Sequence, residues 1–159
     1  MLTAEVLDEI GKTVCDKLRY NVMNVSYAPG YPPVNASGRL YNSIRYEVTG
    51  GGVLKVYAED YIYELAYGRK PGGNAKALAG DLKDWVMVKL GYSEIQKATQ
   101  VAYQIAKSIV KKGTLYYQIG GTKILSSVIN PELDKSIKDK LALEFTASIQ
   151  SEVLKVYQV

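Results

Sequence analysis

The segment between residues 44 and 58 places the strongest limit on the fold. Ile44, Tyr46 and Val48 alternate with polar residues, and a turn of three glycines leads into a second alternating run that ends at Ala58. Alternation with a period of two is typical of a strand with one wet face, so 44–58 is predicted to be a β-hairpin. A lone hairpin is only marginally stable, so it must pack on helices or gain further strands.

Apolar stripes at three- and four-residue steps predict three long amphipathic helices. These helices are expected at 3–24, 93–112 and 131–157. Shorter helices are expected at 39–43, 60–67 and 76–90, and Trp85 and Leu90 are predicted to lie on the inner face of the last. The predicted fold is therefore α+β, a single domain over 1–159 in which the small antiparallel sheet packs with long helices. We expect the three long helices to cover one face of that sheet.

Punctuating residues predict where several helices begin and end. Gly91 and Gly113 are placed to end helices, and Asn130 before Pro131 is a strong start signal. Ser93, with Gln96 three residues on, predicts a capping box for 93–112. Residues 114–130 are harder to interpret: 115–119 is predicted to be a strand, and 122–129 a short helix or a strand.

Two loops are candidate contact regions. The loop 26–38 contains three prolines, and the loop 68–75 contains Gly68, Pro71 and Gly73. Neither carries an apolar stripe that could fold onto a core, so both are predicted to contact neighbouring protein, with simple mobility as the alternative. The chain has 14 Tyr against one Phe and one Trp, and Tyr suits interfaces; a lineage bias would explain the excess equally well. The candidate subunit contacts are Tyr27, Tyr31, Tyr61, Tyr67, Arg69 and Lys70.

The positive charge is concentrated in the middle third of the chain. The formal net charge is +4, and residues 61–113 alone hold nine basic and four acidic side chains. Lys97, Lys107 and Lys111 fall on the side of the predicted helix 93–112 opposite its apolar stripe. This face is a candidate surface for contact with DNA or with a neighbouring protein, and a plain solvated face is the alternative.

The composition removes many catalytic and metal sites. Histidine is absent and Cys15 is the single cysteine, so Ser-His-Asp triads, Cys-His dyads, the usual zinc sites and a disulfide within the chain are excluded. Glu59-Asp60 is expected to be a solvated strand end. We predict no enzymatic activity, no catalytic, cofactor-binding or metal residues, and no cofactor. The acidic first ten residues do not resemble a targeting peptide, and no run is long enough to span a membrane.

The run Ser37-Gly38-Arg39-Leu40-Tyr41-Asn42-Ser43-Ile44 resembles a motif of tailed-phage neck and tail-completion proteins. In that family a long helix and a Pro-rich loop precede the motif, and a β-hairpin and an aromatic segment ending in Gly follow it. Residues 1–70 reproduce this order, with Tyr61 to Gly68 as the aromatic segment; 75–159 is a helical part with no family motif. Two positions depart from the pattern, because Ala66 replaces the usual Glu and Arg69 the usual Thr.

The resemblance implies a structural virion protein without catalysis, made in the host cytoplasm. Such a protein forms a homo-oligomeric ring of six or twelve copies, with twelve favoured, in the head–tail connector or tail-completion region. Its partners would be the adjacent portal or adaptor and tail proteins, with genomic DNA passing through non-specifically and no membrane involved. In such a ring Lys97, Lys107 and Lys111 would form the candidate DNA-channel or inter-ring face. The alternatives are a small basic nucleic-acid-binding protein that uses the lysine face, and an enzyme of unknown type.

Overall fold

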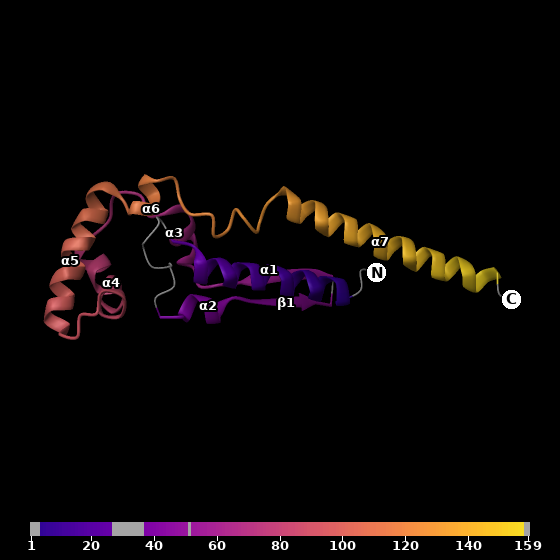
Figure 1. Cartoon of the computed structure of the whole chain (residues 1–159), viewed down its shortest axis with the longest axis horizontal. Coiled ribbons are helices and arrows are strands. Elements are labelled where there is room, and N and C mark those ends of the chain that lie inside the picture. Colours follow the sequence, from indigo (N-terminus) through magenta and orange to yellow (C-terminus); the bar gives the residue numbers. More distant parts are fainter. Residues whose placement is uncertain (1–3, 27–36, 51, 158–159) are drawn as a thin grey trace.

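The structure, a computed structural model, describes residues 4–26, 37–50 and 52–157. The molecule is elongated, with a helical hairpin at one end and a long helix that extends past the body at the other (Figure 1). Its elements, in chain order, are α1 (Ala4–Asn24), α2 (Arg39–Ser43), β1 (Arg45–Thr49), β2 (Val53–Tyr57), α3 (Ile62–Tyr67), α4 (Ala75–Leu90), α5 (Ile95–Lys112), α6 (Leu115–Gln118) and α7 (Pro131–Tyr157).

The predicted β-hairpin and α+β class are confirmed. β1 and β2 pair antiparallel, with Arg45 opposite Tyr57 and Thr49 opposite Val53. The turn closes through a hydrogen bond from the Gly52 N–H to the Thr49 carbonyl at 3.0 Å, and Gly52 has φ 74°. A residue with a side chain adopts that conformation with difficulty, which explains a glycine at this position.

Helix α1 covers one face of the hairpin and supplies more buried residues to the first hydrophobic core than any other element. Its buried side is a single stripe, and Gly11 within it lets the helix approach the sheet closely. A Cβ at Gly11 would lie 2.4 Å from Cδ2 of Tyr46 and 2.8 Å from Cδ1 of Leu54. The buried members of this core are Val6, Ile10, Val14, Cys15, Leu18, Val22, Leu40, Ile44, Ile62, Ala66, Ile124, Leu125 and Val128.

The prediction that three long helices cover the sheet is wrong, because α1 alone does so among the described elements. α5 packs against α4 instead, and α7 makes only marginal contact with α1. α5 packs against α4 because its buried side chains are small. Ala98, Ala102 and Ala106 form its buried line, and small residues let two helices approach closely. An apolar stripe predicts that a helix face is covered without saying what covers it.

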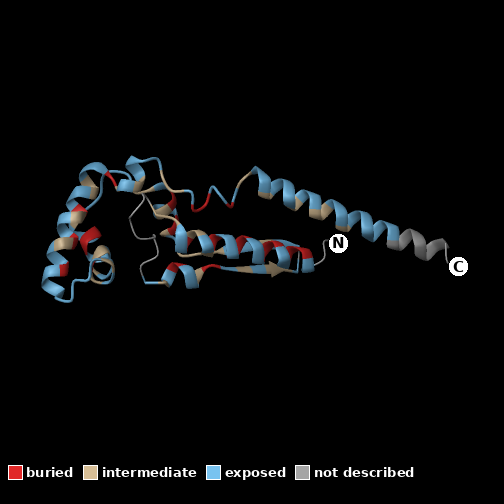
Figure 2. Cartoon of the chain, in the orientation of Figure 1, coloured by how far each residue is buried: buried red, intermediate tan, exposed pale blue. Residues whose placement is uncertain are grey.

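Helices α4 and α5 form a second hydrophobic core of their own. Leu78, Ala79 and Val86 of α4 meet the alanine line of α5. Trp85 and Leu90, predicted on the inner face, are exposed, because the side turned toward α5 is centred on Leu82 and Val86. Buried residues thus gather in two separate places along the molecule (Figure 2).

The ends of α4 and α5 agree with the sequence in part. Gly91 ends α4 with φ 72°, and Gly113 ends α5 with φ 80°, as predicted. The N-cap of α5 is Glu94 rather than Ser93, and no side chain caps it, so the predicted capping box is absent.

Residues 114–130 contain a short helix and a series of turns instead of a strand. The Thr114 hydroxyl accepts a hydrogen bond from the Tyr117 N–H, which starts α6 in the segment predicted as a strand. Residues 122–129 form turns and no regular element, yet Ile124, Leu125 and Val128 are buried in the first core. The Asn21 side-chain amide donates to the Ile124 carbonyl at 2.9 Å and to Ser127 Oγ at 2.8 Å, which fixes these turns against α1.

Helix α7 begins as predicted and then leaves the body. Oδ1 of Asn130 accepts a hydrogen bond from the Leu133 N–H at 2.9 Å, which caps the helix. Leu133, Ile137 and Leu141 pack against the first core, and Lys140 forms an ion pair with Glu9 of α1. From residue 142 to residue 150 the helix is exposed, apart from the half-buried Glu144 (Figure 2).

None of the helices in the described part of the chain combines the length and apolar character needed to cross a membrane.

Candidate functional site

The turn at 37–44 packs against the body through Leu40 and Ile44, which are both buried members of the first core. Gly38 has φ 77° and starts α2, while Leu40 is 2% exposed and Ile44 is fully buried. Ser43 Oγ donates to the Leu40 carbonyl at 2.8 Å and accepts from the Glu59 N–H at 3.0 Å. The residues that carry the family resemblance therefore join α2 to both strands of the hairpin.

Arg39 is one of the exposed residues of this turn, and it lies over Tyr61. Its guanidinium carbon is 5.5 Å from the centre of the Tyr61 ring, and its Nε is 3.9 Å from a carboxylate oxygen of Glu59. Tyr61 packs against the first core, and this burial raises the pKa of its hydroxyl although Arg39 acts in the opposite direction. Of the predicted subunit contacts, Tyr61 is therefore half-buried within its own chain.

Tyr67, Arg69 and Lys70 lie at the junction between α3 and the helical hairpin. Tyr67 is exposed on α3, next to the equally exposed Tyr63. Arg69 pairs with Glu64 at 3.6 Å, and its backbone bonds to Thr114. Tyr67 and Lys70 remain candidate contacts, whereas Arg69 has partners inside the chain. Tyr27 and Tyr31 lie outside the described residues.

The loop after α3 folds onto its own chain. The Gly72 N–H donates to the Val110 carbonyl at 2.9 Å, so residues 69–72 run beside 110–114. This pairing brings Lys70 to the same end of α5 as Lys111 and Lys112. The predicted contact of 68–75 with a neighbour stays a prediction, but the internal hydrogen bonds show that this loop needs no partner to be ordered.

The lysine face of α5 is exposed as the sequence predicts. Lys97, Lys107 and Lys111 all lie on the side away from α4. Nζ of Lys97 is 2.9 Å from Oε1 of Glu94, and Nζ of Lys107 lies 5.8 Å from the centre of the Tyr103 ring. α5 contains no Asp or Glu, so apart from Glu94 at its start the face carries no compensating acid.

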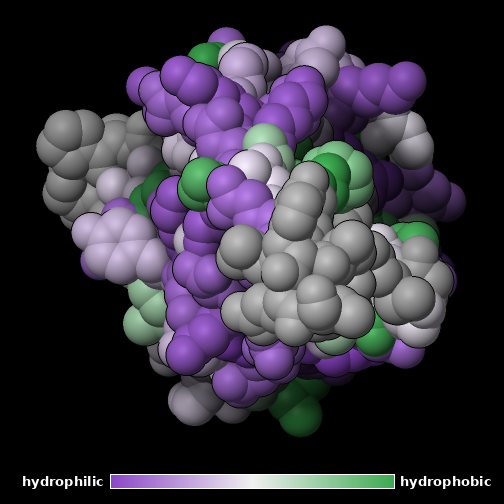
Figure 3. All heavy atoms as spheres, turned by 90° about the vertical axis from the view of Figure 1, so that its right-hand side faces the viewer, coloured by the Kyte–Doolittle hydropathy of each residue, from purple (hydrophilic) through white to green (hydrophobic). Residues whose placement is uncertain are grey.

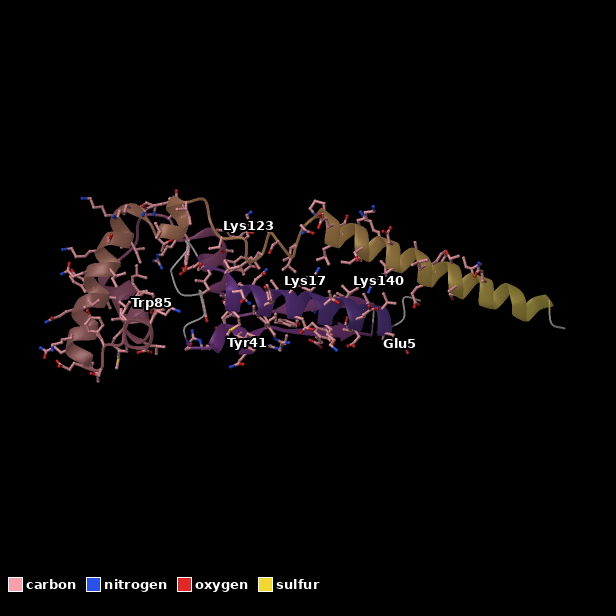
Figure 4. The ribbon with its side chains drawn as sticks, in the orientation of Figure 1. Glu5, Lys17, Tyr41, Trp85, Lys123 and Lys140 are labelled. Atoms are coloured by element: carbon pink, nitrogen blue, oxygen red, sulfur yellow. The ribbon has the colours of Figure 1, made fainter. Side chains whose placement is uncertain are left out.

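A groove of about 770 Å³ separates the body from α4. Leu40 and Tyr61 line one wall, and Leu78, Trp85 and Val88 line the other. Figure 4 shows Trp85 on the side of α4 that is turned toward the body. Trp85 was predicted on the inner face of this helix. Its place at the margin of the α4 apolar stripe is the sequence signal for its observed position.

Large apolar side chains are exposed at both ends of the molecule. Phe145 and Ile149 lie on the part of α7 beyond the body, and Leu90, Tyr92 and Ile95 lie around the turn between α4 and α5. Viewed end-on from the α7 side, the surface is mainly hydrophilic and its apolar residues form separate small patches (Figure 3). The exposed apolar residues described on this part of α7, Phe145 and Ile149, lie along the side of the helix.

Within the described ranges, no three Asp, Glu or Cys side chains gather as a metal site. Comparison with family models, curated proteins and solved structures finds no match to this chain.

Proposed function

We propose that the chain is a structural virion subunit that assembles into a ring in the head–tail connector or tail-completion region of a tailed phage. In this role it joins the portal or an adaptor to the tail and surrounds the DNA channel, without catalysis. A ring of twelve copies is the favoured assembly.

The observation that carries this proposal is the exposure of apolar side chains at two distant places. Phe145 on α7 is 67% exposed and Ile95 at the far end is 64% exposed. Burying one such side chain in an interface is worth roughly 1.5–3 kcal/mol, which favours association. A ring subunit needs two different flanking surfaces, because each head-to-tail contact joins one face to another.

The order of elements also supports the proposal. Helix α1, the Gly38–Ile44 turn, the hairpin and the Tyr-rich α3 follow one another as in the family that the sequence resembles. The turn residues Leu40 and Ile44 are buried in the first core, so packing explains why apolar residues stand at these two positions of the motif.

Native mass spectrometry and electron microscopy of the purified full chain test this proposal. A closed ring of defined copy number is expected, with a mass that stays constant on dilution once the ring has closed. A single chain at every concentration up to the solubility limit would contradict it.

The second candidate is a small nucleic-acid-binding protein that uses the lysine face of α5. The specific observation in its favour is that this face carries exposed lysines on a helix without acidic residues. Lysines that neutralise phosphates release counterions, so binding would weaken steeply with salt. Binding of the single chain to duplex DNA, measured by fluorescence anisotropy at several salt concentrations, distinguishes this candidate from the first.

A further inference from the structure

The side of α7 on which its apolar residues lie shifts progressively along the helix. Leu133, Ile137, Leu141, Phe145 and Ile149 follow one another at steps of four residues. Each step of four turns about 40° past a full turn, because an α-helix advances about 100° per residue. Leu133 and Ile137 therefore face the core, whereas Phe145 and Ile149, here called the distal α7 face, are rotated away from it and are exposed.

This spacing argues against pairing of α7 with another α7 in a coiled coil. A coiled-coil seam needs alternating steps of three and four residues, which keep the apolar line on one side. The unbroken steps of four on α7 spread its apolar residues around the helix, and the exposed Leu143 lies on yet another side. The distal α7 face is therefore shaped to meet a different kind of surface.

The far end of the molecule offers such a surface at the turn between α4 and α5. Leu90, Tyr92 and Ile95, here called the hairpin tip, are exposed and lie within six residues of chain. The two faces are at opposite ends of the elongated molecule, so they cannot cover each other within one chain (Figure 1).

The α4–α5 segment and the α1–α7 part of the molecule carry net charges of opposite sign. The segment 75–112, which includes the hairpin tip, holds seven lysines and three acidic residues. α1 and α7 together hold nine acidic and seven basic residues, and Glu5, Asp8 and Glu9 gather in the first turns of α1 beside α7. Opposite charges steer two surfaces into register and disfavour contact between like ends.

We infer that the distal α7 face binds the hairpin tip of a second copy of this chain in a head-to-tail contact. The inference rests on the proposed ring and names the two surfaces that form it. Such a contact is heterologous: every copy uses both faces, and the chain of contacts ends only when the ring closes.

Two single variants and their mixture test this contact. Phe145→Glu removes one face and Ile95→Glu removes the other; both side chains are exposed, so the fold is expected to persist, as circular dichroism would verify. Each variant alone is expected to run as a single chain in native mass spectrometry. Their equimolar mixture is expected to give dimers and nothing larger, because one intact contact can form between them.

Leu143→Glu is the matched control, since Leu143 is 71% exposed on the same helix but on another side. It is expected to assemble like the unmodified chain. If Phe145→Glu does not fold, Ile149→Glu replaces it.

The outcomes separate this inference from the proposed function. A wild-type ring that persists in Phe145→Glu or in Ile95→Glu overturns the head-to-tail contact and leaves the ring standing. Monomeric variants whose mixture stays monomeric also overturn it. A wild-type chain that never assembles overturns both.

Discussion

Arg69 and Thr114 hold each other through two hydrogen bonds across the base of the α4–α5 hairpin. The Arg69 N–H donates to Thr114 Oγ1 at 2.9 Å, and the Thr114 N–H donates to the Arg69 carbonyl at 2.9 Å. Because the chain enters and leaves the hairpin between these residues, the pair joins the second core to the first. Gly113 allows this approach, since a Cβ there would lie 2.9 Å from the Arg69 carbonyl oxygen.

Replacing Thr114 by Val is expected to destabilise the protein by about 1–3 kcal/mol. The Thr114 hydroxyl accepts from both Arg69 and Tyr117 backbone N–H groups, and valine of similar shape leaves both without that acceptor. Urea denaturation measures the loss. Thr114→Ser keeps the hydroxyl and serves as the control; a loss of stability in Thr114→Ser with none in Thr114→Val would show that the methyl group, not the hydrogen bonds, matters.

Gly11→Ala is expected to lower the free energy of unfolding by about 1–3 kcal/mol, because its Cβ would collide with Tyr46 and Leu54. Gly80→Ala is the matched control in the interior of α4, where a Cβ meets nothing within 4 Å. There alanine should stabilise the helix by about 0.5–1 kcal/mol. Thermal melts of both variants measure the effects, and the same sign for both would contradict the close approach of α1 to the hairpin.

The single thiol, Cys15, is expected to react slowly with a thiol reagent while the chain is folded. Cys15 is 1% exposed, and burial raises the pKa of its thiol. Because the pKa of the thiol is higher in the folded state than in the unfolded state, the neutral thiol contributes to the free energy of unfolding. That contribution is complete below the ordinary pKa of about 8.5 and is lost as the pH rises through the higher pKa of the folded state.

Labelling of Cys15 at pH 8 is expected to be slower in the native state than in urea by a factor on the order of 10² or more, since access requires opening of the core. Equal rates in the two states would place Cys15 outside the core.

Changing Lys97, Lys107 and Lys111 together to Glu is expected to leave the chain folded, because all three side chains are exposed. If this face meets DNA, the log–log salt slope of binding should fall by about 3, at roughly 0.9 per phosphate contact. In assembled particles, genome retention or ejection should be impaired.

The control for the lysine face changes Lys12, Lys17 and Lys123 to Glu, with the same change of charge on exposed positions elsewhere. Equal losses of DNA binding in both triple variants would show that the effect comes from the net charge of the chain and not from the lysine face of α5. Normal DNA binding and normal infectivity with the first would exclude a DNA-facing role.

Removal of the helical hairpin should leave the rest of the chain folded. Replacing residues 71–112 by a short glycine linker keeps every buried member of the first core, and Arg69 and Thr114 already lie side by side. The expected product unfolds cooperatively in urea, loses the helical signal of α4 and α5, and still protects Cys15 from labelling. Rapid labelling of Cys15 would show that the body depends on the hairpin.

Local structure was largely predictable here, because local residues determine it. Alternation around three glycines gave the β-hairpin, and Gly91, Gly113 and Asn130 marked helix ends where the structure has them. The strand predicted at 115–119 was wrong because the Thr114 cap and the positive φ angles of Gly120 and Gly121 favour a short helix between turns.

Packing partners were not predictable, because a stripe does not say which surface covers it. Ala98, Ala102 and Ala106 are equally consistent with a helix on a sheet and with the observed helix pair. For the candidate site, exposure of the α5 lysines followed from helical periodicity. The backbone pairing of Arg69 with Thr114 joins residues 45 positions apart and leaves no local signal.

The split between the two cores also sets the order in which the chain can fold during synthesis. The α4–α5 pair is made of neighbours in sequence, so it can form as soon as residue 112 has left the ribosome. The surface of α1 that Ile124 covers stays open until the chain has grown by about another 12 residues, from 112 to 124, although Asn21 was made 103 positions earlier. Throughout that interval the first core lacks Ile124, Leu125 and Val128, so a nascent chain halted there is expected to expose apolar surface of the kind that chaperones bind.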